Sequence, residues 1–403
     1  MSAPKSRLSR LVSWRDVRAA AERRLPRPLF EYVDGGAEDE VTLRANEQAF
    51  RSIGFRPRMA VWNPSPELAT SVLGTQIAIP LLTAPCGGMR LVHPDGDIAV
   101  ANAAARHGTI AVVPSSSCFT LEEISRRSED GPRWFQLYRF MNEQTMYGLV
   151  ERAGAAGYDA LMVTVDTVAA GQRERDLRNG FSYNMRPDVH TAIRLARRLG
   201  ARPRWLFGYV RDGMPFQLAN TIGSGYTSSS SRLTAMSRTS AESQSPTWRD
   251  ICKIRQMWGK PLVVKGILTA DDARRAVDCG ADAIVVSNHG GRQLESAPAT
   301  VHVLPEIAAA IGDSAEILLD SGVRRGNDVL KALALGARAV LVGRSVVYGL
   351  AVAGADGVSW VLDLLRTDMV RSMRLMGLTS VDAADASWVE NTCCRTSLNS
   401  LAK

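Results

Sequence analysis

Short apolar segments rich in β-branched residues alternate with amphipathic segments from about residue 78 to residue 342. The apolar segments predict strands over 77–82, 109–113, 134–138, 159–165, 261–264, 283–287, 317–319 and 339–342. The amphipathic segments predict helices over 97–107, 270–277, 303–311 and 326–335, with a further helix beginning after Thr120. Nearly continuous apolar strands that alternate with helices are typical of a parallel sheet covered by helices.

The number of predicted strands favours a closed barrel. Eight parallel strands, each followed by a helix, form a (β/α)8 or TIM barrel, which takes about 250 residues before insertions. A doubly wound open sheet is the alternative, but no G-x-G-x-x-G follows the first strand. We therefore expect an α/β protein whose 403 residues form a single barrel domain over 1–403.

Two segments lie outside this alternation. Residues 1–75 precede the first strand and are predicted to form an N-terminal helical cover. Residues 181–246 stand where the loop after the fourth strand is expected. Connections longer than about 15 residues are usually functional or mobile. The later part of this insertion, 227–245, is rich in Ser and Thr, so we expect it to be poorly ordered.

Composition indicates a globular protein that binds anions. The chain has 45% apolar and 22% charged residues, which allows a sizeable core. Lys plus Arg is 49 against 41 for Asp plus Glu, which leaves a net charge of +8. This excess suits a phosphorylated cofactor, a carboxylate substrate or an anionic membrane surface. Only 6% of residues are aromatic and no stacking array accompanies the basic runs, which argues against a nucleic-acid partner.

The chain shows no signal for export or for a membrane span. No apolar run reaches about 18–20 residues, and the longest candidate, 339–353, is interrupted by Arg344. Residues 1–10 are basic but no apolar signal core follows them, so we expect a cytoplasmic protein. The six cysteines show neither a C-x-x-C pair nor zinc spacing, which predicts reduced thiols and no metal site. Adjacent Cys393 and Cys394 are expected to be unpaired.

Chemically active side chains stand where the predicted strands end, which is where parallel barrels place their active sites. Ser287 to Leu294 follows the sixth strand and contains His289 and Arg292. Lys265, Asp166, Gln136 and Tyr138 end three other strands. Alone, a histidine is more often structural and an aspartate at a strand end more often caps a helix. A base, a carboxylate to orient it, cations and a phenol at one end of a barrel together favour an active site.

A phosphate site is predicted beside them. Asp320 to Gly326 follows the seventh strand, and Gly343-Arg344 follows the eighth. Loops after the last two strands of such barrels bind phosphate through backbone amides and a helix N-terminus. Gly322 lets the backbone approach the anion, and Arg324 and Arg344 supply charge. The alternative is ordinary glycine turns with solvated arginines.

With these motifs, the chain resembles the FMN-dependent 2-hydroxy-acid oxidoreductases, the family of glycolate oxidase, flavin-type L-lactate dehydrogenase and mandelate dehydrogenase. The resemblance covers about residues 14–378. It rests on Tyr32 to Asp39, Phe135 to Tyr138, Thr164 to Asp166, Lys265-Gly266, Ser287 to Leu294 and Asp320 to Gly326. Gly171 to Asn179 and Arg202 to Trp205 are most similar to the mandelate dehydrogenase branch.

The resemblance implies a role for each substrate-site residue. Arg292 and Arg173 would hold the substrate carboxylate, for which a planar bidentate donor is suited. Tyr32 would add a hydrogen bond to that carboxylate, and Tyr138 would bind the substrate hydroxyl or the developing carbonyl oxygen. His289 would be the base, with Asp166 fixing its tautomer and stabilising the imidazolium.

The resemblance also implies FMN as the cofactor. Lys265 would sit beside the N1–C2 edge of the flavin, where negative charge collects on reduction. Gln136 and Thr164 would hydrogen-bond the ring, and the backbone from Pro85 through Cys86 to Gly87 would pass along its face. The remaining residues that we assign to the cofactor are Ser115, Ser287, Asp320, Gly322, Arg324, Gly343 and Arg344.

Three positions depart from the pattern of the family. Cys86 stands where family members usually have Thr. Ser116 replaces a Trp that lines the pocket of glycolate oxidase, and Ala170 replaces a nearby Leu. Both of these changes open space around the substrate side chain. We therefore expect an aromatic or long-chain 2-hydroxy acid to be preferred over glycolate.

The predicted activity is oxidation of an L-2-hydroxy acid to the 2-oxo acid, with the electrons passed on to a quinone or to oxygen. The resemblance also implies that the protein is a homotetramer. One alternative is a member of the same family that matures a peptide-derived redox cofactor. Retention of Tyr32, Arg173 and Arg292 argues against it, because that work does not require binding a small carboxylate. The other alternative is a barrel without catalysis that serves as a membrane-bound scaffold.

The inserted segment itself suggests contact with a membrane. Between residues 186 and 216, arginines such as Arg204 and Arg211 are interleaved with aromatic residues such as Trp205 and Phe207. Cationic side chains with aromatic anchors and no spanning length are typical of segments that lie on an anionic membrane surface. The resemblance to mandelate dehydrogenase, which is membrane-associated through the corresponding loop, implies a peripheral location on the inner face of the cell membrane. The alternative is a surface helix that covers the barrel mouth or a subunit interface.

Overall fold

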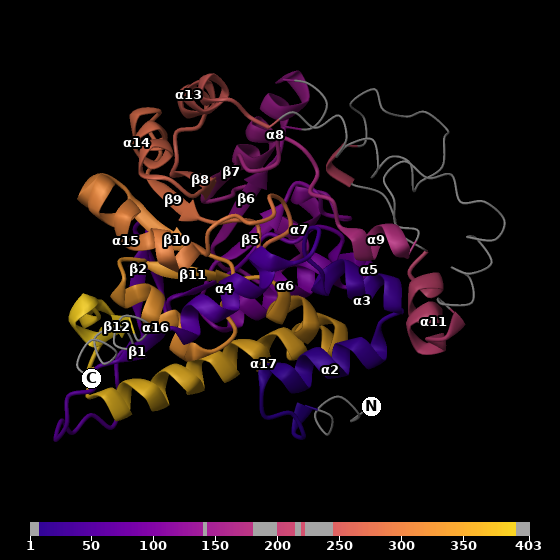
Figure 1. Cartoon of the computed structure of the whole chain (residues 1–403). Helices are drawn as coiled ribbons and strands as arrows, with labels where there is room; N and C mark the ends of the chain where they lie inside the picture. Colours follow the sequence, from indigo (N-terminus) through magenta and orange to yellow (C-terminus); the bar gives the residue numbers. More distant parts are fainter. Residues whose placement is uncertain (1–7, 140–142, 180–199, 214–218, 222–244, 392–403) are drawn as a thin grey trace.

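The computed structural model describes residues 8–139, 143–179, 200–213, 219–221 and 245–391. At its centre is a closed barrel of parallel strands in the order β10-β11-β4-β5-β6-β7-β8-β9, with helices around it (Figure 1). Strands that follow one another along the chain are neighbours in the barrel, and β11 closes it against β4. This confirms the predicted (β/α)8 barrel and excludes the open sheet.

The barrel strands are short and buried on both faces. They are β4 Leu81–Thr83, β5 Ala111–Pro114, β6 Arg133–Leu137, β7 Ala160–Thr164, β8 Leu262–Ile267, β9 Ala283–Val286, β10 Glu316–Leu319 and β11 Ala339–Val342. Successive side chains point to opposite faces of a strand. Met162 and Val285 therefore belong to a cluster inside the barrel, whereas Val163 and Val286 pack in the larger cluster under the helices. Burial on both faces explains why the strands read as continuous apolar runs.

A small hairpin plugs the end of the barrel at which the strands begin. β2 Thr70–Val72 and β3 Thr75–Ile77 pair antiparallel, and Val72 and Ile77 join the inner cluster. The strand predicted over 77–82 is wrong at its start, because Ile77 belongs to the hairpin and the barrel strand begins only at Leu81. Pro80 has no N–H for a strand ladder, so the run breaks there. The opposite end of the barrel carries the polar strand ends.

Helices cover the outside of the barrel, and the five that the sequence predicted lie close to their predicted positions. They are α6 Gly96–Arg106, α7 Leu121–Arg127, α8 Glu143–Ala155, α13 Trp248–Met257, α14 Ala270–Asp278, α15 Thr300–Ile311, α16 Gly326–Ala334 and α17 Arg344–Met376. The predicted cap of α7 is present, because the Thr120 hydroxyl accepts from the Glu123 amide at 3.1 Å. Four short elements complete the set: α5 Met89–Val92 and the 3₁₀ turns η2 Gly312–Ser314, η3 Val381–Ala383 and η4 Ala386–Trp388.

The N-terminal segment contributes α2 Trp14–Arg24, α3 Arg27–Asp34 and α4 Val41–Arg51. α2 packs along α17 (Figure 1). β1 Ile53–Phe55 pairs antiparallel with β12 Val389–Asn391, so the C-terminal end of the described chain is tied to the N-terminal segment. The 1–75 segment is therefore helical at first but ends in β1 and β2.

α17 is the one helix of the described residues that is long and apolar enough to cross a membrane, contrary to the expectation that no such segment exists. In its most apolar window, however, 72% of the residues are buried inside the protein. The helix is also interrupted at Ala353 and Gly354, which have non-helical backbone angles. Because most of this window is buried, α17 is a helix of the layer around the barrel that packs in the hydrophobic core.

The chain between β7 and α13 carries α9 Glu174–Arg178, α11 Pro203–Arg211 and the turn η1 Ala219–Thr221. α11 is attached to the barrel: the Trp205 indole donates to the Leu91 carbonyl at 2.9 Å, and Asp212 pairs with Arg90 at 2.8 Å. The Ser- and Thr-rich stretch up to residue 244, and the predicted membrane segment before residue 200, lie outside the described residues.

The expectation of reduced thiols is wrong for one pair of cysteines. Cys252 on α13 and Cys279 at the end of α14 form a disulfide, with Cα atoms 4.7 Å apart. They are 27 residues apart in the sequence without any motif, and only the packing of α13 against α14 brings them together. Cys86 and Cys118 are free thiols, whereas Cys393 and Cys394 lie outside the described residues. Among the described residues no group of His, Cys, Asp and Glu suits a metal ion.

Candidate active site

A cavity opens at the end of the barrel opposite the hairpin. The predicted site residues that line it are Tyr32, Pro85, Cys86, Gly87, Ser116, Tyr138, Ala170, Arg173, Lys265, His289, Arg292, Asp320, Gly322, Arg324, Gly343 and Arg344. The other predicted residues, Ser115, Gln136, Thr164, Asp166 and Ser287, lie behind this lining and hydrogen-bond within it. The fold thus brings the predicted residues into one place, although the first and last of them, Tyr32 and Arg344, are 312 positions apart in the sequence.

Three side chains form a line across the cavity. His289 Nδ1 lies 2.9 Å from Asp166 Oδ1, and His289 Nε2 lies 3.3 Å from the Tyr138 hydroxyl. Asp166 follows β7, and its side chain packs so closely on Gly266 that a Cβ there would lie 2.7 Å from the Asp166 Cβ. Gly266 has φ +108°, so any other residue would be strained as well as crowded. This packing fixes the carboxylate that in turn orients the imidazole.

Burial and neighbouring charges set the ionisation of this line. Burial opposes the charged form of Asp166, but His289 and Lys265 outweigh it and lower the pKa of the carboxyl. Burial also opposes the charged form of Lys265, while Asp320 and Asp166 raise its pKa overall. Burial, and then the charge of Asp166, raise the pKa of the Tyr138 phenol. The site therefore holds a carboxylate, an ammonium and a neutral phenol at neutral pH.

Two arginines flank Tyr32 on the other side of the cavity. The Arg292 guanidinium lies 5.0 Å from the centre of the Tyr32 ring and donates to the carbonyls of Tyr32 and Gly35, at 2.7 and 3.0 Å. Arg173 lies 6.0 Å from the same ring, and its Nε pairs with buried Asp176 at 2.8 Å. The fold thus holds the two cations close to one phenol, which suits an anionic ligand.

One end of the cavity is formed by the loops after β10 and β11, where the sequence predicts a phosphate site. Arg324 pairs with Glu47 at 3.1 Å, and Arg344 donates to the carbonyls of Val33, Gly290 and Gly35. Burial, and then the charges of Arg292 and Arg324, lower the pKa of Arg344 to about 10. Cations that destabilise one another in this way are complementary to a bound anion.

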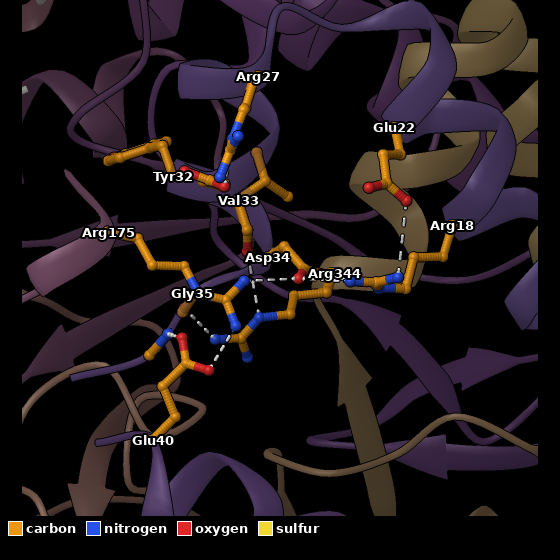
Figure 2. A network of polar contacts seen from close by, with 12 residues as sticks. Arg18, Glu22, Arg27, Tyr32, Val33, Asp34, Gly35, Glu40, Arg175 and Arg344 are labelled. Carbon is orange, nitrogen blue, oxygen red and sulfur yellow. Dashed lines mark hydrogen bonds and ion pairs between the residues drawn. The ribbon is translucent and has the colours of Figure 1, made fainter. Parts of the chain in front are cut away.

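An ionic network around the buried Asp34 carboxylate supports these loops from outside. The Asp34 carboxylate accepts from Arg18 at 2.7 Å, from Arg175 at 3.1 Å and from the Tyr348 hydroxyl at 2.7 Å. Figure 2 shows that Arg175 also pairs with Glu40, and that Arg344 hydrogen-bonds the backbone carbonyls of Val33 and Gly35. The network joins α2, α3, α9 and α17, and so links the insertion to the end of the cavity that Arg344 lines.

The polar residues behind the cavity wall are partly satisfied by one another. Gln136 Nε2 donates to Thr164 Oγ1 at 2.9 Å, and the Ser115 hydroxyl accepts from the Tyr138 amide at 3.1 Å. Gln136 Oε1 and Thr83 Oγ1 are buried without a partner among the described residues. Unpaired buried polar atoms are costly and usually indicate a bound polar partner.

The departures from the family pattern lie on the cavity wall. Ser116 is half-buried and packs against Gly87, where a Cβ would lie 2.5 Å from the Ser116 hydroxyl. Ala170 is exposed at the rim. Burial raises the pKa of the Cys86 thiol to about 11, which keeps it neutral and unreactive.

Sequence reasoning assigned no role to three residues that the structure connects to the site. Gln293 donates to the carbonyls of Asp166 and Ala169 and accepts from the Gly171 amide at 3.0 Å, which fixes the loop after β7. Ser321 lines the cavity, and Asn46 pairs with Asn288 behind it. Gln293 and Ser321 belong to motifs already identified, but nothing near Asn46 in the sequence indicates its contact.

Comparison with known proteins gives a consistent result. The profile of the FMN-dependent dehydrogenase family matches residues 21–391. An L-lactate oxidase of Nostoc sp. is 42% identical, over 92% of this chain and 95% of the relative. A putative L-lactate dehydrogenase of Mycobacterium tuberculosis is 39% identical over 94% and 89%, and the (S)-mandelate dehydrogenase of Pseudomonas putida is 38% identical over 94% of both chains.

Solved structures agree with the sequence relatives. The structure of monotopic membrane protein (S)-mandelate dehydrogenase matches with a TM-score of 0.88 and 38% identity, over 95% of this chain and all of the other. The structure of mandelate oxidase with (S)-4-hydroxymandelic acid matches with a TM-score of 0.80 and 38% identity, over 94% and 98%. The similarity therefore extends over nearly the whole length of each protein.

Proposed function

Because the chain belongs to the FMN-dependent dehydrogenase family, we propose that it oxidises an L-2-hydroxy acid to the 2-oxo acid at the mouth of the barrel. The observation that carries this proposal is the line Asp166–His289–Tyr138 beside Arg292 and Arg173. It combines a base, an oriented carboxylate, a hydroxyl donor and two cations, which are the groups needed to bind and deprotonate a hydroxy acid.

The described residues fit FMN as the cofactor. Arg324 and Arg344, whose positive charges repel each other, would hold the phosphate together with the backbone amides near Gly322 and Gly343. Lys265 would face the flavin edge that becomes negative on reduction. The unpaired Gln136 oxygen would accept a ring N–H, beside Thr164. Bound FMN supplies a two-electron acceptor that the protein's own side chains lack.

The remaining steps belong to the protein. Arg292 and Arg173 hold the substrate carboxylate, and Tyr32 adds a hydrogen bond. Tyr138 donates to the substrate oxygen, because its raised pKa keeps the phenol protonated. His289 Nε2 takes a proton from the substrate, and the two electrons that the substrate loses would pass to FMN. Asp166 stays ionised because of its lowered pKa, so it stabilises the imidazolium without taking the proton itself.

The cavity wall favours a bulky side chain on the substrate. Ser116 and Ala170 are small, and both line the cavity. We therefore infer that a mandelate-like or long-chain acid is a better substrate than glycolate. A pocket contact contributes only about 1–3 kcal/mol to discrimination, so this is a preference.

The direct test is anaerobic mixing of the purified yellow protein with lactate, glycolate and mandelate in turn. Bleaching of the flavin absorbance by at least one acid, fastest with mandelate, is expected. A colourless protein that does not take up FMN would support the scaffold alternative. A yellow protein bleached by none of the acids would support the alternative of cofactor maturation.

We further propose that α11 rests on an anionic membrane surface and that electrons pass to a quinone. Phe207 and Val210 are 69% and 53% exposed, and with Arg204 and Arg211 they form the outer face of the helix. Trp205, expected to enter the membrane, instead hydrogen-bonds the barrel at Leu91 and stacks on Tyr209. Exposed apolar side chains among arginines are typical of interfacial helices.

Vesicle sedimentation tests this part. The full chain should sediment with phosphatidylserine vesicles at low salt, and the double variant Phe207→Ser/Val210→Ser should stay in solution while it still reduces a soluble dye. The matched control is Trp62→Ser/Leu375→Ser, which removes two exposed apolar side chains elsewhere. Equal sedimentation of both double variants, or none by the parent protein, would exclude α11 as the contact. A homotetramer on the cytoplasmic face remains our expectation, to be checked by light scattering and cell fractionation.

A further inference from the structure

The base of the proposed reaction stands on an unusual stretch of backbone. His289, Gly290 and Gly291 have φ values of 58°, 68° and 72°, so three consecutive residues are left-handed. Glycine adopts this conformation freely, but a residue with a Cβ rarely does. The direction of the His289 side chain therefore depends on whatever holds this turn.

Three side-chain oxygens hold it, one for each amide. The His289 amide donates to the Ser287 hydroxyl at 3.1 Å, and the Gly290 amide to the Ser321 hydroxyl at 2.9 Å. The Gly291 amide is shared between the backbone carbonyl of Asn288 at 3.0 Å and Asn288 Oδ1 at 3.1 Å. Each N–H of the left-handed turn thus has a polar side chain as its partner.

Ser321 reaches this turn from the loop after the next strand. Its hydroxyl donates to Asp320 Oδ1 at 2.7 Å, which leaves a lone pair for the Gly290 amide. Asp320 pairs with Lys265 at 3.2 Å, and Lys265 donates to the Ser287 hydroxyl at 2.9 Å. The contacts close a ring that joins Lys265 to the backbone on both sides of His289. Ser321 is itself left-handed, with φ 75°, although glycine would take this conformation without strain.

The third of these oxygens, Asn288 Oδ1, is held by Asn46, which comes from a distant part of the chain. Asn46 Nδ2 donates to Asn288 Oδ1 at 2.9 Å, and Asn288 Nδ2 donates to Asn46 Oδ1 at 2.8 Å. Asn46 lies on α4 and is 1% exposed. Asn288 Nδ2 also donates to the Pro298 carbonyl at 2.9 Å, so its oxygen is the atom that faces the Gly291 amide.

We propose that Ser321 and Asn46 are positioning residues, which hold the 289–291 turn so that the His289 imidazole meets Asp166 and Tyr138. This inference rests on the proposed function of His289 as the base. Small displacements of a reacting group reduce rates strongly, by roughly 100-fold for a shift near 1 Å.

Two variants of Ser321 separate its hydroxyl from its backbone strain. Ser321→Ala removes the hydroxyl and keeps the strain, whereas Ser321→Gly removes both. If the hydroxyl positions His289, both variants should bind FMN and yet reduce it roughly 10- to 100-fold more slowly at saturating substrate. Should the alanine variant fail to fold, the glycine variant carries the test. A glycine variant as fast as the parent would overturn the role of the hydroxyl.

The Asn46 arm uses a nearly isosteric change. Asn46→Asp keeps an acceptor for Asn288 Nδ2 but removes the donor to Asn288 Oδ1, and Gln48→Ala on the exposed side of α4 is the control. Asn46→Asp should lower kcat with little change in KM, and Gln48→Ala should change neither. Equal kcat in Asn46→Asp and the parent would contradict the proposal.

A spectroscopic readout distinguishes positioning from a purely structural role. The proton on His289 Nδ1, bonded to Asp166, should give a downfield resonance that is absent in His289→Ala. The Ser321 and Asn46 variants should shift or broaden it. A lower melting temperature with this resonance and kcat unchanged would overturn the inference. If the parent protein reduces its FMN with none of the acids, the proposed function fails, and the resonance alone still tests the positioning.

Discussion

The Nδ1 atom of His289 lies 2.9 Å from the Oδ1 atom of Asp166, although the two residues are 123 positions apart in the chain. This contact leaves Nε2 facing Tyr138 and the cavity, so the imidazole is held in the orientation that a base requires.

Replacing His289 by alanine should therefore keep bound FMN and remove its reduction by substrate. General base catalysis contributes roughly 10²–10⁴-fold, so the rate of anaerobic bleaching should fall by at least that factor. Asp166→Asn is the companion variant, which keeps the shape and loses the charge. Bleaching of His289→Ala at near the parent rate would show that another group takes the proton.

Arg292 offers a test of carboxylate binding. Arg292→Lys keeps the charge but loses the fork of donors, two of which are directed at the Tyr32 and Gly35 carbonyls in the structure. Hydrogen bonds to charged groups contribute about 1.5–3 kcal/mol, so kcat/KM should fall roughly 10- to 100-fold. Steady-state kinetics with a soluble dye measures it. An unchanged kcat/KM would mean that the carboxylate is held elsewhere.

Ser116→Trp should shift the preference toward small acids. The indole would fill space beside Gly87 that a bulky substrate side chain otherwise occupies. The ratio of kcat/KM for mandelate to that for glycolate should fall roughly 10- to 200-fold, which corresponds to about 1–3 kcal/mol of transition-state binding. Ser116→Thr, a smaller increase in volume, serves as the control. No change in the ratio for the tryptophan variant would remove the argument from pocket size.

Asp34 links stability to pH. Burial opposes its charged form, but hydrogen bonds from Arg18 and Tyr348 and the charges of Arg18 and Arg175 outweigh this and lower its pKa below the ordinary value. A carboxyl with a lowered pKa in the folded state contributes stability above the unfolded pKa near 4, and this contribution is lost as the pH falls through the folded pKa.

Asp34→Asn should accordingly reduce the free energy of unfolding by about 2–3 kcal/mol at neutral pH, because Arg18 and Arg175 lose their shared anion. The difference from the parent should shrink below about pH 4. Denaturant unfolding at several pH values measures both. Asp271→Asn, an exposed carboxyl with one surface partner, is the control. A difference that does not depend on pH would exclude the ionic account.

Local patterns were sufficient for the barrel and for most of the site. Continuous apolar strands follow from burial on both faces of the sheet, which is a property of each segment alone. The residues at the strand ends then meet at one mouth, because a parallel barrel brings all its carboxyl ends together. His289, Asp166, Tyr138, Lys265 and Arg292 could be assigned to one cavity for this reason, before any coordinates.

The element order, the barrel and the end of the barrel that carries the polar strand ends therefore follow from the amino-acid sequence alone. Which side chains meet follows from the packing of the elements: Cys252 with Cys279, Trp205 with the Leu91 carbonyl, and Asn46 with Asn288. Such contacts depend on distances of a few ångströms between elements that are far apart in the sequence but packed together in the fold. Hydrophobic periodicity indicates which face of an element is buried, but it carries no information about the partner that covers it.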